Sequence, residues 1–373
     1  MKTTRRAFLN SSLAGAAALA WARPAASQPP LPAQAPSRIR FAAVGLNHAH
    51  INSQVETVVR AGGQLVAFFA REPELAAAFG KRFPGARLAR SEQEILDDPA
   101  IQLVVSAAIP NERAPLGVRV MRHGKDFMTD KPGATTLAQL AEARRVQAET
   151  KRMYSVLIER HESQVINKAG ELVKAGAIGR VLQTIGLAPH RMTPDSRPAW
   201  FFRREQYGGV LCDLASHNLD AYLYFTGSTH AEIVASQVGN LNHPTYPELE
   251  DFGDVMLRGN GGTGYIRVDW FTPGGIETYG DSRLTILGTD GYMELRKNVD
   301  IGGRPGAGHL FLVDQKQTRY VDCGGVKLLY GERLVDDVLN RTETASAQAE
   351  TFLAMELALH AEQQAQRVTS PTV

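Results

Sequence analysis

Cysteine is scarce in this sequence, where Cys212 and Cys323 are the only two among 373 residues. They allow at most one disulfide, which an oxidising compartment would permit, but the sequence does not show that they meet. Cys212 adjoins Asp213 and is expected to be a small core residue. Apolar content of 43% and charged content of 21% are ordinary for a soluble globular protein, and the length suits two domains.

A basic block and a long hydrophobic run are also missing. The formal net charge is +2, but residues 1–27 hold four of the 41 bases and no acid, which leaves 37 bases against 39 acids. No cluster of Lys or Arg stands elsewhere, and this argues against nucleic-acid binding. The charge-free run after Arg6 is about 16 residues long, too short and too poor in Leu and Ile for a stable membrane span.

The N-terminus resembles an export signal. Thr4-Arg5-Arg6-Ala7-Phe8-Leu9 is similar to a twin-arginine motif, whose pathway carries folded proteins across the inner membrane. An ordinary secretory signal with a chance arginine pair is the alternative. We expect a signal peptide over residues 1–27, with cleavage near Ala25-Ala26-Ser27, and a Pro/Ala-rich extended tether over residues 28–37. The expected location is the periplasm, with the twin-arginine export machinery as a partner.

From Ile39 to about Arg160, short apolar strands alternate with helices. Such alternation predicts a parallel sheet covered by helices on both faces, with functional residues in the loops after the strand C-termini. We therefore expect a Rossmann-type, doubly wound domain over residues 38–160. The predicted strands are residues 40–44, 65–69, 101–107, 126–129 and 153–158, and the predicted helices are residues 51–61, 73–83, 114–122 and 137–150.

Beyond Arg160 the pattern changes to strand-like runs separated by turn signals. A helix is predicted before them at residues 165–175, and a long helical pattern follows them at residues 345–367. The runs suit a largely antiparallel sheet with one open face, so we expect an α+β domain over residues 161–373 and an α/β class for the whole chain. The predicted strands are residues 181–188, 231–237, 254–258, 263–271, 283–287, 292–296 and 310–315.

Glycine is missing where a dinucleotide-binding turn normally requires it. After the first strand such a domain has Gly-x-Gly-x-x-Gly, which lets backbone amides and a helix N-terminus approach a pyrophosphate. Here the turn is Gly45-Leu46-Asn47-His48-Ala49-His50, and only the first glycine is present. Asn47 tolerates a left-handed backbone, which partly rescues the turn. His48 and His50 either border a functional cofactor loop, contribute to a metal or substrate site, or are structural.

The second predicted strand lacks the acid that usually binds the adenosine ribose. The run there is Phe69-Ala70-Arg71-Glu72. Arg71 could face a 2′-phosphate, which would favour NADP, or it could be a solvated charge that leads the next helix. The sequence leaves both interpretations open.

One predicted helical face carries three ionisable side chains. Asp213, His217 and Asp220 follow the pair Gly208-Gly209 at spacings of four and three, so they project from the same side. Burying two acids and an imidazole is costly unless they line a polar cavity, and an imidazole beside a carboxylate can move protons near neutral pH. A solvated face is the alternative. Apolar residues between these three indicate packing against a core, so we interpret the face as a site.

Several blocks, taken in order, resemble those of the Gfo/Idh/MocA family (glucose–fructose oxidoreductase, inositol dehydrogenase and rhizopine catabolism proteins). The resemblance covers nearly all of the chain after the expected signal. Asp130-Lys131-Pro132 ends a segment similar to the family's GKHVxxEKP, and the spacing of Asp213 and His217 matches its catalytic aspartate and histidine. Further matches are Pro110-Asn111 in a loop beside the nicotinamide, Gly176-Ala177-Ile178-Gly179 at the start of the second domain, and Gly288-Thr289-Asp290-Gly291-Tyr292 in a late sheet turn.

The resemblance implies hydride exchange between a nicotinamide cofactor, NAD or NADP, and a sugar or polyol. It implies that His217 takes the hydroxyl proton as general base, that Asp213 orients it or binds a neighbouring hydroxyl, and that Lys131 polarises the developing alkoxide. His48 and His50 in the glycine turn, and Ala114 where the family often has histidine, depart from the pattern. The expected cofactor-binding residues are Gly45, Asn47, His48, Arg71, Pro110, Asn111 and Lys131.

Polar residues of the second domain are expected to bind the substrate. Arg197 and His190 could hold a carboxylate or sugar hydroxyls, and Trp200 could stack on a pyranose face. Loop structure with one aromatic anchor is the alternative. Asp220 could instead orient His217 from the next helical turn. The complete set is His161, His190, Arg197, Trp200 and Asp220.

Export would constrain the chemistry, because free nicotinamide nucleotides are not replenished outside the cytoplasm. We therefore expect an exported oxidoreductase with a tightly bound cofactor, acting on a sugar, polyol or sugar acid. One alternative is redox-neutral lyase or glycosidase chemistry with bound NAD. Others are a metal held by His48, His50 and one of His161, Asp213 or His217 for lyase or hydrolase chemistry, or a non-catalytic sugar-binding protein. Family analogy also implies a homo-oligomer.

Overall fold

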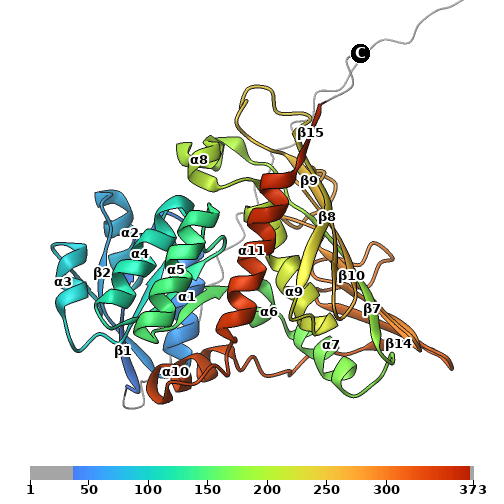
Figure 1. Cartoon of the computed structure of the whole chain (residues 1–373), viewed down its shortest axis with the longest axis horizontal. Helices are drawn as coiled ribbons and strands as arrows, with labels where there is room; N and C mark the ends of the chain where they lie inside the picture. The colour runs from blue at the N-terminus through green and yellow to red at the C-terminus, as the bar shows by residue number, and fades with distance from the viewer. Residues whose placement is uncertain (1–36, 370–373) are drawn as a thin grey trace, which may run out of the picture. The chain divides into compact units, whose positions relative to one another are not determined.

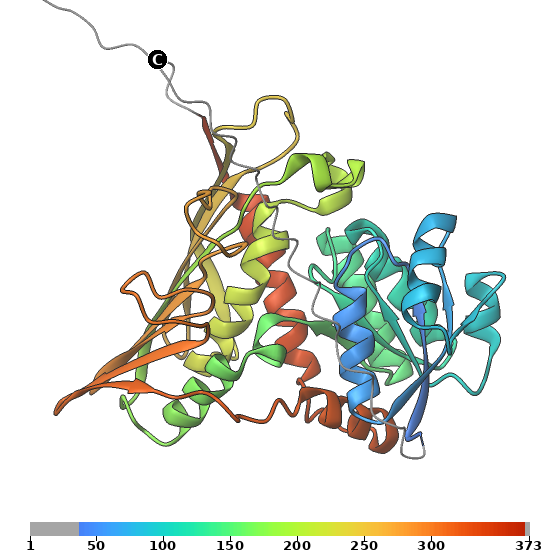
Figure 2. The same cartoon turned by 180° about the vertical axis from the view of Figure 1, so that it is seen from behind.

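The computed structural model describes residues 37–369. The expected signal peptide and all of the expected tether except Ser37 lie outside the described residues. Within the described part, no helix combines the length and the apolar character needed to cross a membrane. Two sheets organise residues 37–369 (Figures 1 and 2).

The first sheet has six parallel strands in the order β3-β2-β1-β4-β5-β6, which is the doubly wound arrangement predicted from the sequence. Strands β4, β5 and β6 are buried at every position, as expected for strands covered on both faces. The strands are β1 (Ile39–Val44), β2 (Gly63–Phe69), β3 (Arg87–Leu88), β4 (Leu103–Ser106), β5 (Asp126–Asp130) and β6 (Tyr154–Leu157).

Helices cover both faces of this sheet because successive strand residues point to opposite sides. Phe41 and Ala43 of β1 pack in one apolar cluster with α1 and α2, whereas Ala42 and Val44 pack in another with α4 and α5. The helices are α1 (Ile51–Arg60), α2 (Pro73–Arg82), α3 (Glu92–Asp97), α4 (Pro110–Arg122) and α5 (Leu137–Thr150).

One helix on the α1 face comes from the far end of the chain and was not predicted. Helix α10 (Tyr330–Asn340) buries Leu334, Val335 and Val338 in the same cluster as α1. These residues recur at near-helical spacing, so a local signal existed. The segment therefore completes the first sheet's cover, although it follows the whole second sheet in sequence.

The second sheet has nine strands in the order β14-β13-β12-β11-β7-β10-β9-β8-β15. Most neighbours are antiparallel, as predicted, but β7 pairs with β10 and β8 pairs with β15 in parallel. The strands are β7 (Val181–Pro189), β8 (Ala231–Asn240), β9 (Phe252–Gly259), β10 (Thr263–Asp269), β11 (Arg283–Gly288), β12 (Gly291–Arg296), β13 (His309–Asp314), β14 (Thr318–Val321) and β15 (Gln366–Thr369).

Helices cover one face of the second sheet and leave large apolar side chains exposed on strands of the other, including Met256 and Tyr292. Helix α11 contacts α9 and β8 and also α5, so it lies between the two sheets (Figure 1). The covering helices are α7 (Gln164–Lys174), α9 (Ser216–Thr226) and α11 (Gln348–Gln364), and shorter helices are α6 (Glu159–Glu162), α8 (Arg204–Tyr207), η1 (Pro194–Ser196) and η2 (Ala199–Phe202).

The C-terminal helix is shorter than predicted. The sequence predicted one helix over residues 345–367, but α11 ends at Gln364 and residues 366–369 form β15. Backbone pairing with the edge of β8 replaces helical hydrogen bonds there. Both cysteines are buried and free, and Cys212 lies in the core as predicted.

Candidate active site

A crevice opens at the C-terminal ends of β1, β2 and β4, where the strand order reverses. Doubly wound sheets bind ligands at this switch point. Gly45 and Asn47 follow β1, Arg71 and Glu72 follow β2, and Glu112 lies in the first turn of α4. The structure thus brings three predicted cofactor-binding residues, Gly45, Asn47 and Arg71, into one crevice.

Gly45 makes the tight turn that leaves β1. Its φ is +74°, and a Cβ at this position would lie 2.5 Å from the Cβ of Ala108, so only glycine fits. Its N–H donates to Phe69 O at 3.1 Å, and its carbonyl accepts from the N–H of Ala107 at 3.0 Å. Asn47 does not adopt the left-handed backbone that the sequence allowed. Its side-chain amide instead donates to Glu72 at 2.8 Å.

Glu72 is the one charged side chain lining this crevice that has no ion-pair partner among the described residues. Arg71 pairs with Glu112 at 3.0 Å, and Arg119 pairs with Glu92 at 2.6 Å. From the sequence, only Arg71 was expected to bind the cofactor here. An acid does line the crevice, three residues beyond the end of β2 rather than at it.

Asp130, the last residue of β5, joins the two unexpected histidines. The Nδ1 atoms of His48 and His50 lie 3.1 Å and 2.9 Å from its two carboxylate oxygens. Arg113 Nη2 donates to it at 3.1 Å, and the N–H of Lys131 donates at 2.8 Å. Burial alone would raise the pKa of Asp130, but the charges of His50 and Arg113 and these hydrogen bonds hold it well below its ordinary range.

His48, His50 and Asp130 could also hold a metal ion, because one ligand atom from each lies within 4.8 Å of the others. Arg113 is buried against the same carboxylate and already balances its charge, so a cation would sit beside a guanidinium. His161, Asp213 and His217, which the sequence offered as a third ligand, are not part of this group. We therefore interpret the three residues as a hydrogen-bonded cluster that positions the glycine-poor turn.

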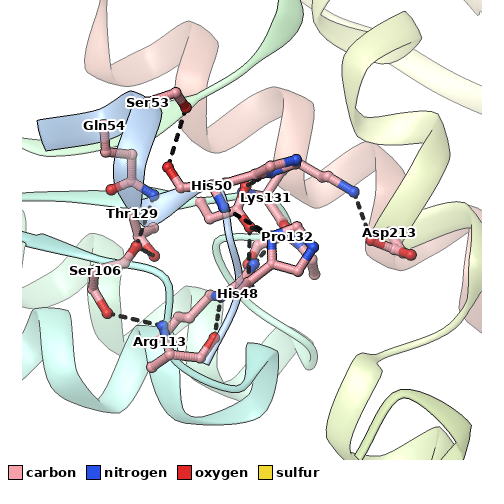
Figure 3. A network of polar contacts seen from close by, with 12 residues as sticks. His48, His50, Ser53, Gln54, Ser106, Arg113, Thr129, Lys131, Pro132 and Asp213 are labelled. Carbon is pink, nitrogen blue, oxygen red and sulfur yellow. Dashed lines mark hydrogen bonds and ion pairs between the residues drawn. The ribbon is translucent and has the colours of Figure 1, made fainter. Parts of the chain in front are cut away.

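Lys131 and Asp213 form a buried ion pair. Lys131 follows β5, and its Nζ donates to Oδ1 of Asp213 at 2.7 Å (Figure 3). Asp213 lies in a single π-helical turn, η3 (Leu211–Ala215), that precedes α9, and such turns are frequent at functional sites. Burial opposes ionisation of Asp213, but Lys131 holds its pKa below the ordinary value. No hydrogen bond joins Asp213 to His217 among the described residues, so Asp213 positions Lys131 rather than the imidazole.

His217 is held by the backbone instead. The N–H of Glu159 donates to Nδ1 of His217 at 3.1 Å, which leaves the proton of the neutral ring on Nε2. Burial, and then the positive charge of Lys131, lowers the pKa of His217 well below its ordinary value. The neutral ring therefore presents a hydrogen-bond donor at Nε2. This is the reverse of the general-base role predicted from the sequence.

These groups line a cleft of about 200 Å³ together with His190, Arg197 and Trp200, so the structure unites most of the predicted catalytic and substrate-binding residues. His190 Nδ1 lies 3.0 Å from the carbonyl of Ala188 and must donate to it, which leaves a lone pair on Nε2. Burial lowers the pKa of His190 to about 4. Trp200 lies at the same wall, with its ring 6.4 Å from that of His48.

Two predicted substrate-binding residues lie elsewhere. Asp220 accepts two hydrogen bonds from the Arg160 guanidinium, at 2.7 and 2.9 Å, and neither orients His217 nor faces the cleft. His161 stacks on Tyr330 at 3.7 Å and lines a different cavity. Asp220 and His161 instead help to pack α6 against α9 and α10. Sequence spacing alone does not show such contacts between helices.

The remaining predicted residues flank the cleft. Pro110 lines it, and Asn111 lies next to Pro110 in the first turn of α4 with a buried Oδ1 that has no hydrogen-bond partner among the described residues. Five further residues were not expected from the sequence, because none of them is itself one of the matched motif positions. They are Arg113, Glu159, Trp270, Tyr279 and Lys297.

Comparison with known proteins identifies both halves of this architecture. Residues 39–158 match a family model described as "Oxidoreductase family, NAD-binding Rossmann fold", and residues 166–294 match one described as "GFO/IDH/MocA C-terminal domain". A solved structure from Erwinia carotovora atroseptica, named as a candidate oxidoreductase, is 44% identical with a TM-score of 0.86 and covers 88% of this chain and 99% of its own.

Curated relatives match over shorter lengths. The levoglucosan dehydrogenase of Pseudarthrobacter phenanthrenivorans is 27% identical over 53% of this chain, and the NADP-dependent scyllo-inositol 2-dehydrogenase of Bacillus subtilis is 25% identical over 48%. The chain spans about half the length of these relatives, 51% of each. A levoglucosan dehydrogenase solved with NADH and levoglucosan shares the fold, with a TM-score of 0.73 at 17% identity.

Proposed function

The chain belongs to the Gfo/Idh/MocA family, and from this premise we propose that it is an oxidoreductase that exchanges a hydride between a nicotinamide nucleotide and a carbinol carbon of a carbohydrate. The observation that carries the proposal is the buried Lys131–Asp213 ion pair at 2.7 Å. It lies in a cleft shared with His217 and with His48 from the turn after β1, next to the switch-point crevice.

The residues of the crevice fit a dinucleotide. Gly45 keeps the tight turn that leads from β1 towards the helix N-terminus, and Asn111 offers a buried Oδ1 whose hydrogen bonding is incomplete among the described residues. Once the ion pairs are formed, the unbalanced charge lining the crevice is the negative charge of Glu72. A carboxylate accepts hydrogen bonds from ribose hydroxyls and repels a 2′-phosphate. We therefore favour NAD over NADP, with Glu72 at the ribose.

A bound nicotinamide nucleotide would accept the hydride in oxidation and supply it in reduction. In reduction, Lys131 gives a proton from Nζ to the carbonyl oxygen as negative charge develops there. In oxidation, the neutral amine of Lys131 takes the hydroxyl proton. Asp213 holds Lys131 in place through the 2.7 Å contact, and His217 donates from Nε2 to the same substrate oxygen. The roles of Lys131 and His217 are thus exchanged relative to the expectation from the sequence.

The test begins with native mass spectrometry of purified protein, before and after denaturation, followed by titration with NAD and NADP. We expect release of NAD, or tighter binding of NAD than of NADP, and turnover of a carbohydrate panel detected by the absorbance of reduced nicotinamide. Lys131→Met should keep the nucleotide and lose turnover. A protein that binds neither nucleotide, or that binds one without oxidising or reducing any carbohydrate, would sink the proposal.

We also propose that the protein is exported to the periplasm with its cofactor already bound. The support is the run Arg5-Arg6-Ala7-Phe8-Leu9, whose resemblance to a twin-arginine motif implies export after folding. Cell fractionation of the tagged full chain, compared with an Arg5→Lys/Arg6→Lys variant, tests this. The full chain should reach the periplasm and the variant should stay inside. Equal distribution of the two would refute this export route.

A further inference from the structure

The charged side chains that line the active-site cleft form ion pairs, except for one cation. Histidines aside, seven charged side chains line it, and six of them form ion pairs. Arg197 has no acidic partner among the described residues. The pairs are Arg113 with Asp130 at 3.1 Å, Lys131 with Asp213 at 2.7 Å, and Lys297 with Glu159 at 3.4 Å.

Aromatic rings hold Arg197 in place without satisfying it. Its Cζ lies 4.4 Å from the ring centre of Phe201, 5.0 Å from that of Trp270 and 5.7 Å from that of Tyr279. These contacts fix the guanidinium by cation–π attraction but use none of its in-plane N–H donors. Nη2 donates to the hydroxyl of Tyr279, and Nε is buried without a partner in the described part of the chain. Nη1 has no partner within residues 37–369 and is not buried, so it is open to a ligand.

Aromatic rings separate Arg197 from the proposed reacting groups. The ring of His190 lies 5.5 Å from those of both Trp270 and Tyr279, which contact the guanidinium. The same histidine lines the cleft together with Lys131 and Asp213. A ligand that reaches both the Lys131–Asp213 pair and Arg197 must therefore carry its anionic group on a different carbon from the carbinol.

We propose that the carbohydrate substrate bears a carboxylate, as in a uronic or aldonic acid, and that Arg197 binds this group. The inference rests on the oxidoreductase function proposed above and specifies its substrate class. One unpaired guanidinium balances one carboxylate, and its planar donors match the two oxygens of that group. A phosphate ester would bring up to two charges and leave excess negative charge in the cleft. Carboxylates are thus favoured over sugar phosphates.

Binding can be measured without turnover, because Trp200 and Trp270 are the only tryptophans after residue 27 and both line the cleft. The nucleotide-loaded protein without residues 1–27 would be titrated with matched neutral and acidic pairs while its fluorescence is recorded. The pairs are D-glucose with D-glucuronate, D-galactose with D-galacturonate, and D-sorbitol with D-gluconate, and D-glucose 6-phosphate is added as a third class. We expect at least one acid to bind about 10-fold or more tightly than its neutral partner, the range of a hydrogen bond to a charged group.

Substitution then assigns the preference to one residue. Arg197→Met keeps the bulk between the rings and should lower affinity for the acids by about 10- to 100-fold, and affinity for the neutral sugars far less. Tyr279→Phe removes only the hydroxyl that fixes Nη2, should weaken the acids less, and serves if the first variant does not fold. Arg203→Met is the matched control, since Arg203 is 66% exposed and pairs with Glu248 outside the cleft.

The outcomes separate this inference from the proposed function. Four outcomes would each overturn the carboxylate assignment. They are tighter binding of neutral sugars than of acids, tighter binding of the phosphate than of either, no binding of any acid, and equal losses of affinity for both classes in Arg197→Met. Bound nucleotide with turnover of any carbohydrate would still support the oxidoreductase. Failure to bind nucleotide would instead remove the proposed function, whatever the sugars show.

Discussion

The Nζ of Lys131 lies 2.7 Å from Oδ1 of Asp213, and the contact ties the end of β5 to the π-helical turn before α9. The two side chains are only 8% and 16% exposed. Each therefore depends on the other for its charge balance, because a buried charge without a partner is costly. The pair links the two sheets at the point where the proposed chemistry occurs.

This interdependence predicts non-additive kinetics. Lys131→Met and Asp213→Asn should each lower kcat/KM by about 10²- to 10⁴-fold, since one removes the proton-transfer group and the other releases it. The double variant should be little worse than either single one, because both break the same unit. Steady-state kinetics, with nucleotide binding measured in parallel, checks this. Losses that multiply in the double variant would contradict the pairing.

The backbone contact of His217 predicts its tautomer. Nitrogen-15 NMR of side-chain-labelled protein should show a neutral ring protonated at Nε2, with no titration as the pH is lowered through its ordinary pKa. His217→Gln can still donate a hydrogen bond and should retain more activity than His217→Phe, which loses that donor and about 10²-fold in kcat. Protonation at Nδ1 would restore the general-base role.

Much of the fold was predictable because its signals are local. The buried apolar runs of the first sheet and the alternating strands of the second each carry their own periodicity, and both sheets were confirmed. Helix α10 and strand β15 were missed for different reasons. The apolar face of α10 is visible in the sequence, but the helix follows the whole second domain in the chain and packs on the first sheet. Strand β15 forms only because it pairs with β8.

The site was predictable only where motifs are contiguous. Lys131, Asp213 and His217 were found from short blocks, but the contact of Asp213 with Lys131 was not foreseen, and the expected contact of Asp213 with His217 is absent among the described residues. Hydrogen bonds such as that between His50 and Asp130 join residues 80 positions apart, and the spacing of residues along the sequence does not predict them. His161 shows the same limit, because a short helix turns its ring onto Tyr330 and away from the cleft.

A substitution at Gly45 tests the nucleotide turn. Gly45→Ala places a Cβ 2.5 Å from that of Ala108 at a φ of +74°, so the turn must shift. We expect lost nucleotide binding and a destabilisation of about 1–2 kcal/mol or more, the cost of left-handed backbone for a non-glycine residue. Gly85→Ala is the control, because no atom lies within 4 Å of the added carbon. Unchanged nucleotide affinity in Gly45→Ala would move the cofactor away from this crevice.

The helix that carries Asp213 and His217 begins on two buried carboxyl groups. Glu250 accepts from the N–H of Val210 and Glu362 accepts from that of Leu211, each at 3.0 Å. Burial, and then the neighbouring Glu250, raises the pKa of Glu362 from its ordinary 4.5 to about 8. Arg204 bonds both acids and offsets part of this repulsion.

The sign of the resulting pH dependence follows from proton binding. Between the unfolded pKa and about 8, the native state keeps a proton on Glu362 that the unfolded chain has lost. The stabilisation from this group is therefore full at low pH, decreases as the pH rises through that window, and is constant above it.

The variant Glu362→Gln cannot ionise, so its stability should not decrease over this window. Its unfolding free energy relative to wild type should rise by about 1 kcal/mol or more from acidic to alkaline pH, one pKa unit's worth. Chemical denaturation at both ends of the window measures this, with Glu356→Gln on the exposed side of α11 as control. A pH-independent difference would place Glu362 ionised throughout, with Arg204 as its full counter-charge.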